Sequence, residues 1–194
     1  MKTIIEPEDS LIIRIKTDMA AKGITADFMG ENFDIAARAM AYSIKNGLGM
    51  FLIGNVGTGK STFFKYMSKF AYGTMPNGID QMPSRYLSLK DPVTLRHLDV
   101  VSGGSFIEDC FNCNIFLDDL GAEYPVNEYG VRREFALDFI LAYSEHGKGI
   151  ISTSTNLNGN GLLDRYTGRI DFLKDLMFRV NFVGETKREW AVTI

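Results

Sequence analysis

The 194-residue sequence contains little cysteine and little histidine. Its only cysteines, Cys110 and Cys113, form an isolated C-x-x-C that lacks the second ligand pair of a structural zinc site. They flank the start of an apolar segment, which favours buried, reduced thiols; a redox role is the alternative. The two histidines, His97 and His146, are far apart in the sequence, and each has an ordinary structural explanation.

Strong net charge and long apolar runs are also missing. The formal net charge is −3, so no overall basic field indicates nucleic acid, and any DNA contact must be local. No apolar run approaches the ~18 residues of a membrane span, and the N-terminus lacks the apolar core of a signal peptide. We therefore expect a cytoplasmic protein that does not associate with membranes.

The hydrophobic content of 45% in a chain of this length is enough for one well-buried domain. We predict a short N-terminal helical extension over residues 1–30 and one main domain over residues 31–194. Within the extension, Leu11, Ile12, Ile15 and Met19 form an apolar stripe at helical spacing that ends near Gly23. This helix either packs on the core or docks a partner.

Further along the chain, short apolar segments alternate with helical patterns. We predict strands at 49–53, 85–89, 114–117, 149–153 and 180–183, with a further edge strand at 188–194. Helices are predicted at 33–45, from 60 to about 71, from 91, around residue 106, at 129–146 and at 165–178, with a loop at 73–83. This alternation predicts an α/β three-layer sandwich, with a parallel central sheet of about five strands covered on both faces.

The stretch Met50 to Phe64 combines a short apolar strand, a glycine-rich loop and the start of a helix. It matches G-x-x-x-x-G-K-[ST], the P-loop pattern, in which backbone N–H groups and a helix N-terminus surround a phosphate. Lys60 is predicted to bridge the β- and γ-phosphates of ATP, and Ser61 to ligate Mg²⁺. The predicted nucleotide-binding residues are Gly54, Asn55, Val56, Gly57, Thr58, Gly59, Lys60, Ser61 and Thr62.

Polar side chains also follow two other predicted strands. Asp118 and Asp119 follow an apolar run, and Asn156 follows the strand at 149–153. The carboxyl ends of parallel strands are where α/β sheets bind ligands. We predict that Asp118 holds Mg²⁺, that Asp119 orients or polarises the attacking water, and that Asn156 hydrogen-bonds that water or the γ-phosphate.

Three segments together resemble the DnaC/IstB group of AAA+ ATPases: G-N-V-G-T-G-K-S-T, I-F-L-D-D-L-G-A-E and I-S-T-S-T-N-L. The resemblance covers residues 31–188. It implies a P-loop NTPase (AAA+-like) domain that binds ATP and Mg²⁺, with Asp118 as the Walker B acid, Asp119 as the catalytic carboxylate and Asn156 as the sensor-1 residue. Homo-oligomerisation in the ATP-bound state is implied too. Only eleven residues follow Val183, too few for the helical lid of many AAA+ proteins.

The family also carries an arginine-rich pattern that supplies arginines to the neighbouring subunit's nucleotide. Arg165 and Arg169 match that pattern, but Phe172 stands where a further arginine is expected. The two arginines therefore serve either as fingers or as a solvated helix face, and Arg179 is an alternative finger. Residues 165–188 hold six basic and three acidic residues, a bias that suits single-stranded DNA or a solvated surface.

Several functions share these motifs. The leading hypothesis is an ATP-hydrolysing DNA-replication accessory protein, similar to a helicase loader, that acts as a nucleotide-dependent switch on a replicative helicase. The alternatives are a transposition ATPase of the IstB type that works with a transposase, a small-molecule phosphotransferase, and a nucleotide-gated binding module with negligible turnover. The compact form and short N-terminus favour a phage or mobile-element origin.

Overall fold

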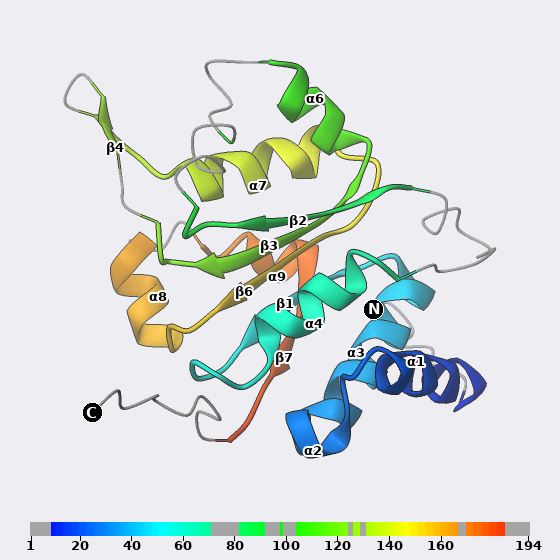
Figure 1. The fold of residues 1–194 in the computed structure, drawn as a ribbon. Helices are drawn as coiled ribbons and strands as arrows, with labels where there is room; N and C mark the ends of the chain where they lie inside the picture. The colour runs from blue at the N-terminus through cyan, green and yellow to red at the C-terminus, as the bar shows by residue number, and fades with distance from the viewer. Residues whose placement is uncertain are drawn as a thin grey trace, which may run out of the picture.

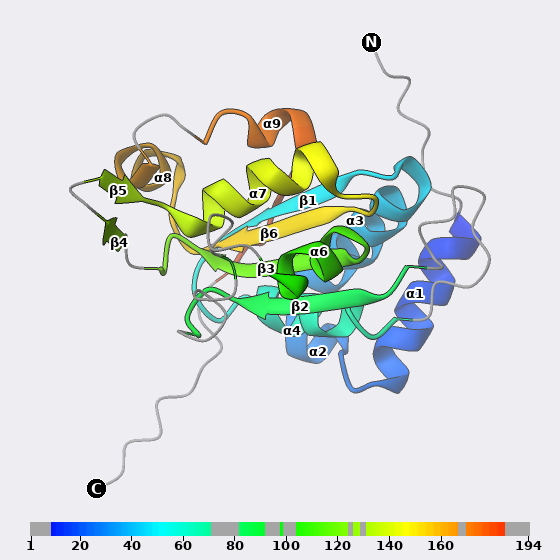
Figure 2. The same cartoon turned by 90° about the horizontal axis from the view of Figure 1, so that it is seen from above.

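The computed structural model describes residues 9–70, 82–91, 98, 104–123, 126–128, 131–166 and 170–184. Its centre is a parallel sheet of five strands in the order β2-β3-β6-β1-β7 (Figures 1 and 2). The strands are β1 (Gly49–Ile53), β2 (Ser84–Ser88), β3 (Asn114–Leu120), β6 (Ile151–Thr155) and β7 (Met177–Asn181). The predicted α/β fold with a parallel sheet of about five strands is confirmed.

Helices cover both faces of this sheet (Figure 1). One layer contains α1 (Asp9–Ala21), α2 (Ala26–Met29), α3 (Asn32–Asn46) and α4 (Lys60–Met67). The other contains α6 (Ser105–Phe111), α7 (Phe135–His146) and α9 (Leu173–Leu176), and α8 (Gly159–Tyr166) lies near the ends of β3 and β6. Successive side chains of a strand point to opposite faces, so Phe116 packs with the first layer, whereas Ile115 and Leu117 pack with the second.

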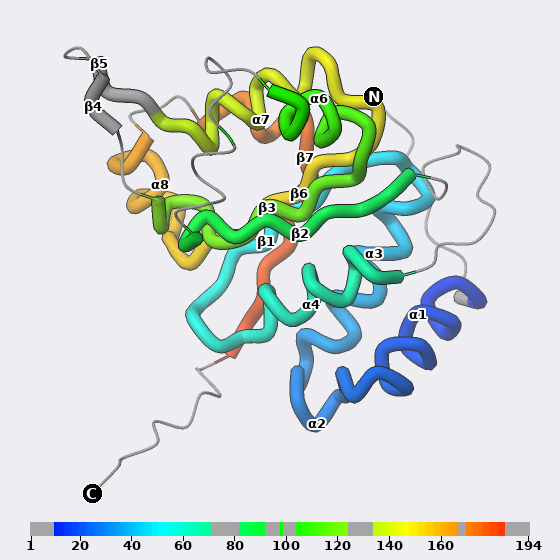
Figure 3. The backbone as a smooth tube through the Cα atoms, turned by 45° about the horizontal axis from the view of Figure 1, so that its top comes forward, coloured from blue at the N-terminus to red at the C-terminus, as the bar shows by residue number. Residues whose placement is uncertain are grey.

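Helix α1 packs along α3 and belongs to the same core as the sheet (Figure 3). Ile15 and Met19 are fully buried, whereas Ile13 is 63% exposed. Two polar contacts tie α1 to its neighbours. The Lys16 ammonium lies 2.6 Å from an oxygen of Asp34 on α3, and the hydroxyl of Tyr66 on α4 donates to Asp18 at 2.8 Å. The predicted division into residues 1–30 and 31–194 stays a prediction.

Two predicted helices differ from the structure. The helix predicted at 129–146 begins at Phe135, because residues 131–133 form β5 (Val131–Arg133), which pairs antiparallel with β4 (Val126–Glu128) and so satisfies backbone groups outside a helix. The helix predicted at 165–178 is found only in part, at the end of α8 and in the four residues of α9. Helix α8 ends at Tyr166, and β7 begins at Met177, where the chain pairs with Gly49 on β1. Pairing with a buried central strand overrides the local helical pattern.

Some strands lie a few residues from their predicted positions in the sequence, and other predictions fall outside the described residues. The strand predicted at 149–153 is found at Ile151–Thr155, and that predicted at 180–183 at Met177–Asn181. The short helix α2 was not predicted. Other predictions concern residues outside the described part: the edge strand at 188–194, the absence of a helical lid, most of the loop at 73–83 and the helix from 91. Among the described residues, no helix is long and apolar enough to cross a bilayer.

Candidate functional site

The glycine-rich loop connects the end of β1 to the first residue of α4. Gly57 and Gly59 have φ of +85° and +97°, values that favour glycine and let the loop turn back above the helix N-terminus. The Lys60 side chain folds under the loop, where its ammonium donates to the carbonyl oxygens of Gly54 at 2.7 Å and Asn55 at 2.8 Å. A buried cation therefore lies directly at the glycine-rich turn, and Lys60 is only 4% exposed.

The loop is fixed from behind by the residues that follow β7. A side chain at Gly54 has no room, because a Cβ there would lie 2.4 Å from the carbonyl oxygen of Phe182. The buried Asn32 side chain donates to the carbonyls of Thr58 at 3.2 Å and Val183 at 2.8 Å, and it accepts from the N–H of Val183 at 2.8 Å. One amide thus joins the phosphate loop to the chain that follows β7.

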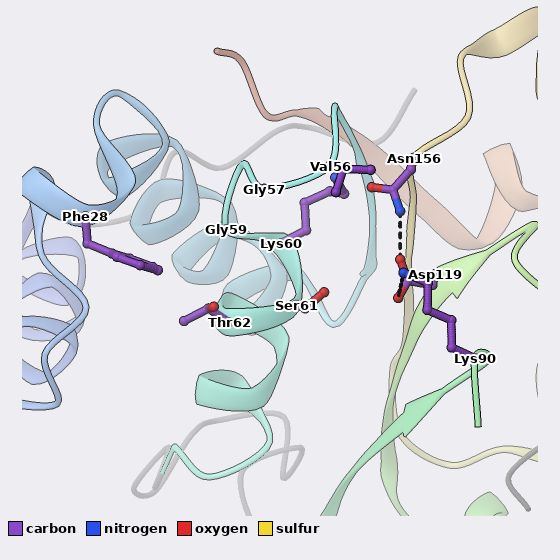
Figure 4. Close-up of a pocket in the computed structure, with 10 residues that line it drawn as sticks. All are labelled: Phe28, Val56, Gly57, Gly59, Lys60, Ser61, Thr62, Lys90, Asp119 and Asn156. Atoms are coloured by element: carbon purple, nitrogen blue, oxygen red, sulfur yellow. Dashed lines mark hydrogen bonds and ion pairs between the residues drawn. The ribbon is translucent and has the colours of Figure 1, made fainter. Parts of the chain in front are cut away.

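A cavity of about 120 Å³ opens above the loop (Figure 4). Its walls come from four parts of the chain that the fold brings together: α2, the phosphate loop with α4, the end of β2, and the ends of β3 and β6. Phe28 lies on one side of the loop, and Asp119 and Asn156 lie on the other. The lining residues are Phe28, Val56, Gly57, Gly59, Lys60, Ser61, Thr62, Lys90, Asp119 and Asn156.

Asp119 is the acidic side chain of this cavity. The Asn156 amide donates to its Oδ1 at 2.7 Å, and the Lys90 ammonium lies 2.9 Å from its Oδ2 (Figure 4). The residue has φ of +67°, and the pairing of β3 with β6 shifts register between Leu117 and Leu120. The irregularity turns Asp119 out of the strand alternation and toward the cavity, and left-handed non-glycine residues often mark functional sites.

Asp118 is held differently from Asp119. It is 1% exposed and does not line the cavity. Its Oδ2 accepts from the Tyr86 hydroxyl at 2.6 Å, and its Oδ1 accepts from the Ser154 hydroxyl. Burial is the main cause that raises the pKa of Tyr86, and the bond to Asp118 raises it further, so this hydroxyl remains a donor at neutral pH. Two neighbouring strands therefore fix the Asp118 carboxylate next to the cavity wall.

Neither of the two predicted arginines that the structure describes, Arg165 and Arg179, lines the cavity. Arg165, at the end of α8, donates to a carboxylate oxygen of Glu134 at 2.6 Å and to the carbonyl of Glu123 at 2.8 Å. Arg169 lies outside the described residues. Arg179 is exposed on β7, where its Nε donates to the Asn181 side chain at 2.8 Å. Arg165 thus makes contacts within its own chain, with 15% of its side chain exposed.

Sequence reasoning missed Lys90, Phe28 and Tyr86. Lys90 comes two residues after β2 and Phe28 belongs to a four-residue helix, so neither lies in a recognisable motif. Tyr86 faces Phe116 across the β2–β3 pairing, two residues before the position that pairs with Asp118. The only available signal was the rule that parallel strands end at one edge, which would have drawn attention to the end of β2.

The donor set at the cavity suits an oxygen-ligated cation better than a soft metal. Mg²⁺ takes oxygen ligands, usually one or two carboxylates together with phosphates and water. The Ser61 hydroxyl and the Asp119 carboxylate line the cavity, and the Asp118 carboxylate lies behind it. Among the described residues, no cluster of three or more histidine, cysteine, aspartate or glutamate side chains has the arrangement of a metal site. The residues fit a Mg²⁺ ion that phosphates and water help to hold.

Comparisons with known proteins found a likeness in structure but none in sequence. No protein family and no curated protein matches the chain. The crystal structure of the DnaC helicase loader matches it with a TM-score of 0.51 and 16% sequence identity, over 93% of this chain and 95% of that chain. The resemblance is thus confirmed for the fold: the chain shares with the DnaC helicase loader an α/β fold, here with a parallel sheet of five strands.

Proposed function

We propose that the chain binds and hydrolyses Mg-ATP and works as a nucleotide-dependent switch on a DNA-bound partner, in the manner of a helicase loader. One observation carries this proposal. The phosphate loop with its buried Lys60 faces Asp119 and Asn156 across one cavity, within a fold that matches a helicase loader along most of its length. Phosphoryl transfer to water uses a cation, a hydroxyl, a carboxylate and an amide, and these groups lie together at one edge of the sheet.

Each residue has a proposed task. Lys60 exchanges its carbonyl partners for the β- and γ-phosphate oxygens, and the loop N–H groups bind the same phosphates. Ser61 at the cavity would ligate Mg²⁺ and Asp118 behind the cavity wall would help to hold it, and the bound ion would neutralise charge on the phosphates. Asp119 accepts a proton from the attacking water, and the Asn156 amide keeps that carboxylate in place through the 2.7 Å bond. The aromatic face of Phe28, which is 49% exposed, borders the cavity on the side away from Asp119.

Removing the loop cation tests the nucleotide site. The Lys60→Ala variant loses a charged hydrogen-bond donor to phosphate, so its Kd for Mg-ATP should rise by about 10- to 100-fold. Titration with a fluorescent ATP analogue measures this change, and phosphate release measures turnover. Lys174→Ala is the matched control, because Lys174 is exposed on α9 and pairs with Asp171. Equal affinities for Lys60→Ala and the wild type would contradict the proposal.

The partner is tested with nucleotide as the variable. The γ-phosphate can determine the conformation of a surface to which a partner binds. The protein bound to a non-hydrolysable ATP analogue should therefore retain a hexameric replicative helicase that the ADP-bound protein releases. Retention of a transposase would assign the same site to a transposition ATPase. Tight ATP binding with no turnover, even with partner and single-stranded DNA present, would favour a nucleotide-gated binding module.

A further inference from the structure

The turn that follows β3 is held in an uncommon backbone conformation. Asp119 has φ of +67° and Gly121 has φ of +94°, and the N–H of Ala122 donates to the Asp119 carbonyl at 2.9 Å. A left-handed aspartate costs free energy and persists only when its surroundings fix it. The turn carries the carboxylate that faces the cavity, so whatever fixes the turn also sets the position of that carboxylate.

The buried Glu123 carboxylate holds this turn through hydrogen bonds. One of its carboxylate oxygens accepts from the N–H of Gly121 at 2.8 Å, and the other accepts from the hydroxyl of Tyr166 on α8. Glu123 is 4% exposed and Tyr166 is 1% exposed. Burial raises the pKa of Glu123, while the bonds from Tyr166 and the backbone lower it. The turn is therefore tied to α8 through a buried side chain.

Arg165 adds a second tie from the same helix. Its guanidinium donates to the Glu123 carbonyl at 2.8 Å and to the Glu134 carboxylate at 2.6 Å, and it lies 4.9 Å from the centre of the Tyr166 ring. Glu134, immediately before α7, is 4% exposed. The planar guanidinium thus joins three segments: the turn after β3, the start of α7 and the end of α8.

From this geometry we infer that Arg165 and Tyr166 are positioning residues for Asp119 of their own chain, and that Arg165 is not a finger for a neighbouring subunit. To reach another subunit, Arg165 would have to break its hydrogen bonds to the Glu134 carboxylate and the Glu123 carbonyl, and bonds between charged, largely buried groups are costly to break. The inference rests on the proposed function, since Asp119 is the carboxylate that acts on water. It assigns Arg165 to the support of the active site in its own chain.

The variants Arg165→Ala and Glu134→Gln distinguish this role from a finger. Arg165→Ala loosens the turn, and because a small misplacement of a reacting group can slow a reaction about 100-fold, kcat should fall on that order. The Kd for ATP should not change, because the hydrogen bonds of Arg165 described above join the turn after β3, α7 and α8, and the phosphate loop is a separate segment. Glu134→Gln should lower kcat in the same direction. A finger would be released by Glu134→Gln, so unchanged or raised kcat in that variant would overturn the inference.

Mixed subunits provide the second test. Equal amounts of Arg165→Ala and Lys60→Ala chains are combined, each with reduced turnover alone for a different reason. If Arg165 acted on a neighbour, sites made from the loop of the first chain and the arginine of the second would regain turnover. We expect no recovery, and recovery would overturn the inference. The Arg179→Ala chain mixed in the same way tests Arg179, the alternative finger.

A readout that needs no turnover separates this inference from the proposed function. Hydrogen exchange of the backbone amides at 119–123 is compared between the wild type, Arg165→Ala, Tyr166→Phe and an exposed control, Arg38→Ala. We expect faster exchange in this turn for the first two variants, with thermal unfolding showing that they are folded. Wild-type protein without ATPase activity would refute the proposed function. Unchanged exchange in both variants would instead refute the inference that Arg165 and Tyr166 position the turn.

Discussion

Asp118 and Asp119 are adjacent carboxylates with different surroundings. Asp118 accepts two hydroxyl donors from neighbouring strands and lies outside the cavity, whereas Asp119 faces the cavity between an amide and an ammonium. The irregularity in β3 causes the difference, since in a regular strand the two side chains would simply point to opposite faces. The cavity side of the site therefore contains one carboxylate balanced by Lys90.

Replacing Lys90 tests its part in anion binding. Lys90→Met removes one of the cations that line the cavity, so ATP should bind about three- to tenfold more weakly, the range of a partly exposed charge contact. ADP should lose less affinity if Lys90 lies nearest the γ-phosphate. Isothermal titration with both nucleotides measures the change. The control Lys174→Met removes a similar exposed ion pair away from the cavity and should leave both affinities unchanged.

Gly54→Ala tests the tight contact between the phosphate loop and the chain after β7. The added methyl group would lie 2.4 Å from the Phe182 carbonyl oxygen, so backbone must move, and we expect a loss of about 1–3 kcal/mol in the free energy of unfolding. Chemical denaturation measures it. Gly159→Ala is the matched control, because a Cβ there meets nothing within 4 Å, and its stability should stay equal or rise slightly. Equal values for both variants would contradict the contact.

At the scale of elements, α1 offers two isoleucines with opposite environments. Ile15 is fully buried against the first helical layer, whereas Ile13 is 63% exposed. Ile15→Ala should lower the free energy of unfolding of the whole protein by about 2–4 kcal/mol, since it leaves a cavity. Ile13→Ala should change it by less than about 0.5 kcal/mol. If Ile15→Ala left the main unfolding transition unchanged, α1 would be an independent appendage.

The elements that sequence predicted best were those with both a pattern and a motif. The strand before Gly54 and the apolar run before Asp118 needed no tertiary information, because burial on both faces leaves continuous apolar segments in a parallel sheet. The helix predicted at 165–178 is found only in part because Met177 pairs with Gly49, a contact between distant parts of the chain. The sequence pattern around Met177 does not indicate that it pairs with Gly49.

The candidate site shows the same limit. Lys60, Ser61, Asp119 and Asn156 were predicted from motifs, and the structure brings them to one cavity. Lys90 was missed because its place depends on where β2 ends in space. Arg165 was found by its pattern, but its pairing with Glu134 arises because the fold brings the end of α8 to the residue before α7, which no spacing in the sequence reveals.

For the whole molecule, nucleotide should stabilise the fold as one unit. Asn32 and Gly54 tie the phosphate loop to the chain after β7, so a ligand at the loop is linked to the sheet and to α3. At an ATP concentration of 100 times Kd, binding should add about 2.7 kcal/mol to the free energy of unfolding. Thermal unfolding with Mg-ATP should show a single transition at higher temperature. Lys60→Ala measured at the same ATP concentration should show a smaller shift.

The strand order has a consequence for synthesis of the chain. β1 lies between β6 and β7, whose residues 151–155 and 177–181 are translated long after residues 49–53. A nascent chain on the ribosome therefore carries its phosphate-loop strand with both edges unpaired until most of the protein has been made. Unpaired apolar strands tend to associate with other chains, so this segment needs protection during translation. Nucleotide cannot assist the earlier stages, because the loop acquires its backing only when β7 has joined the sheet.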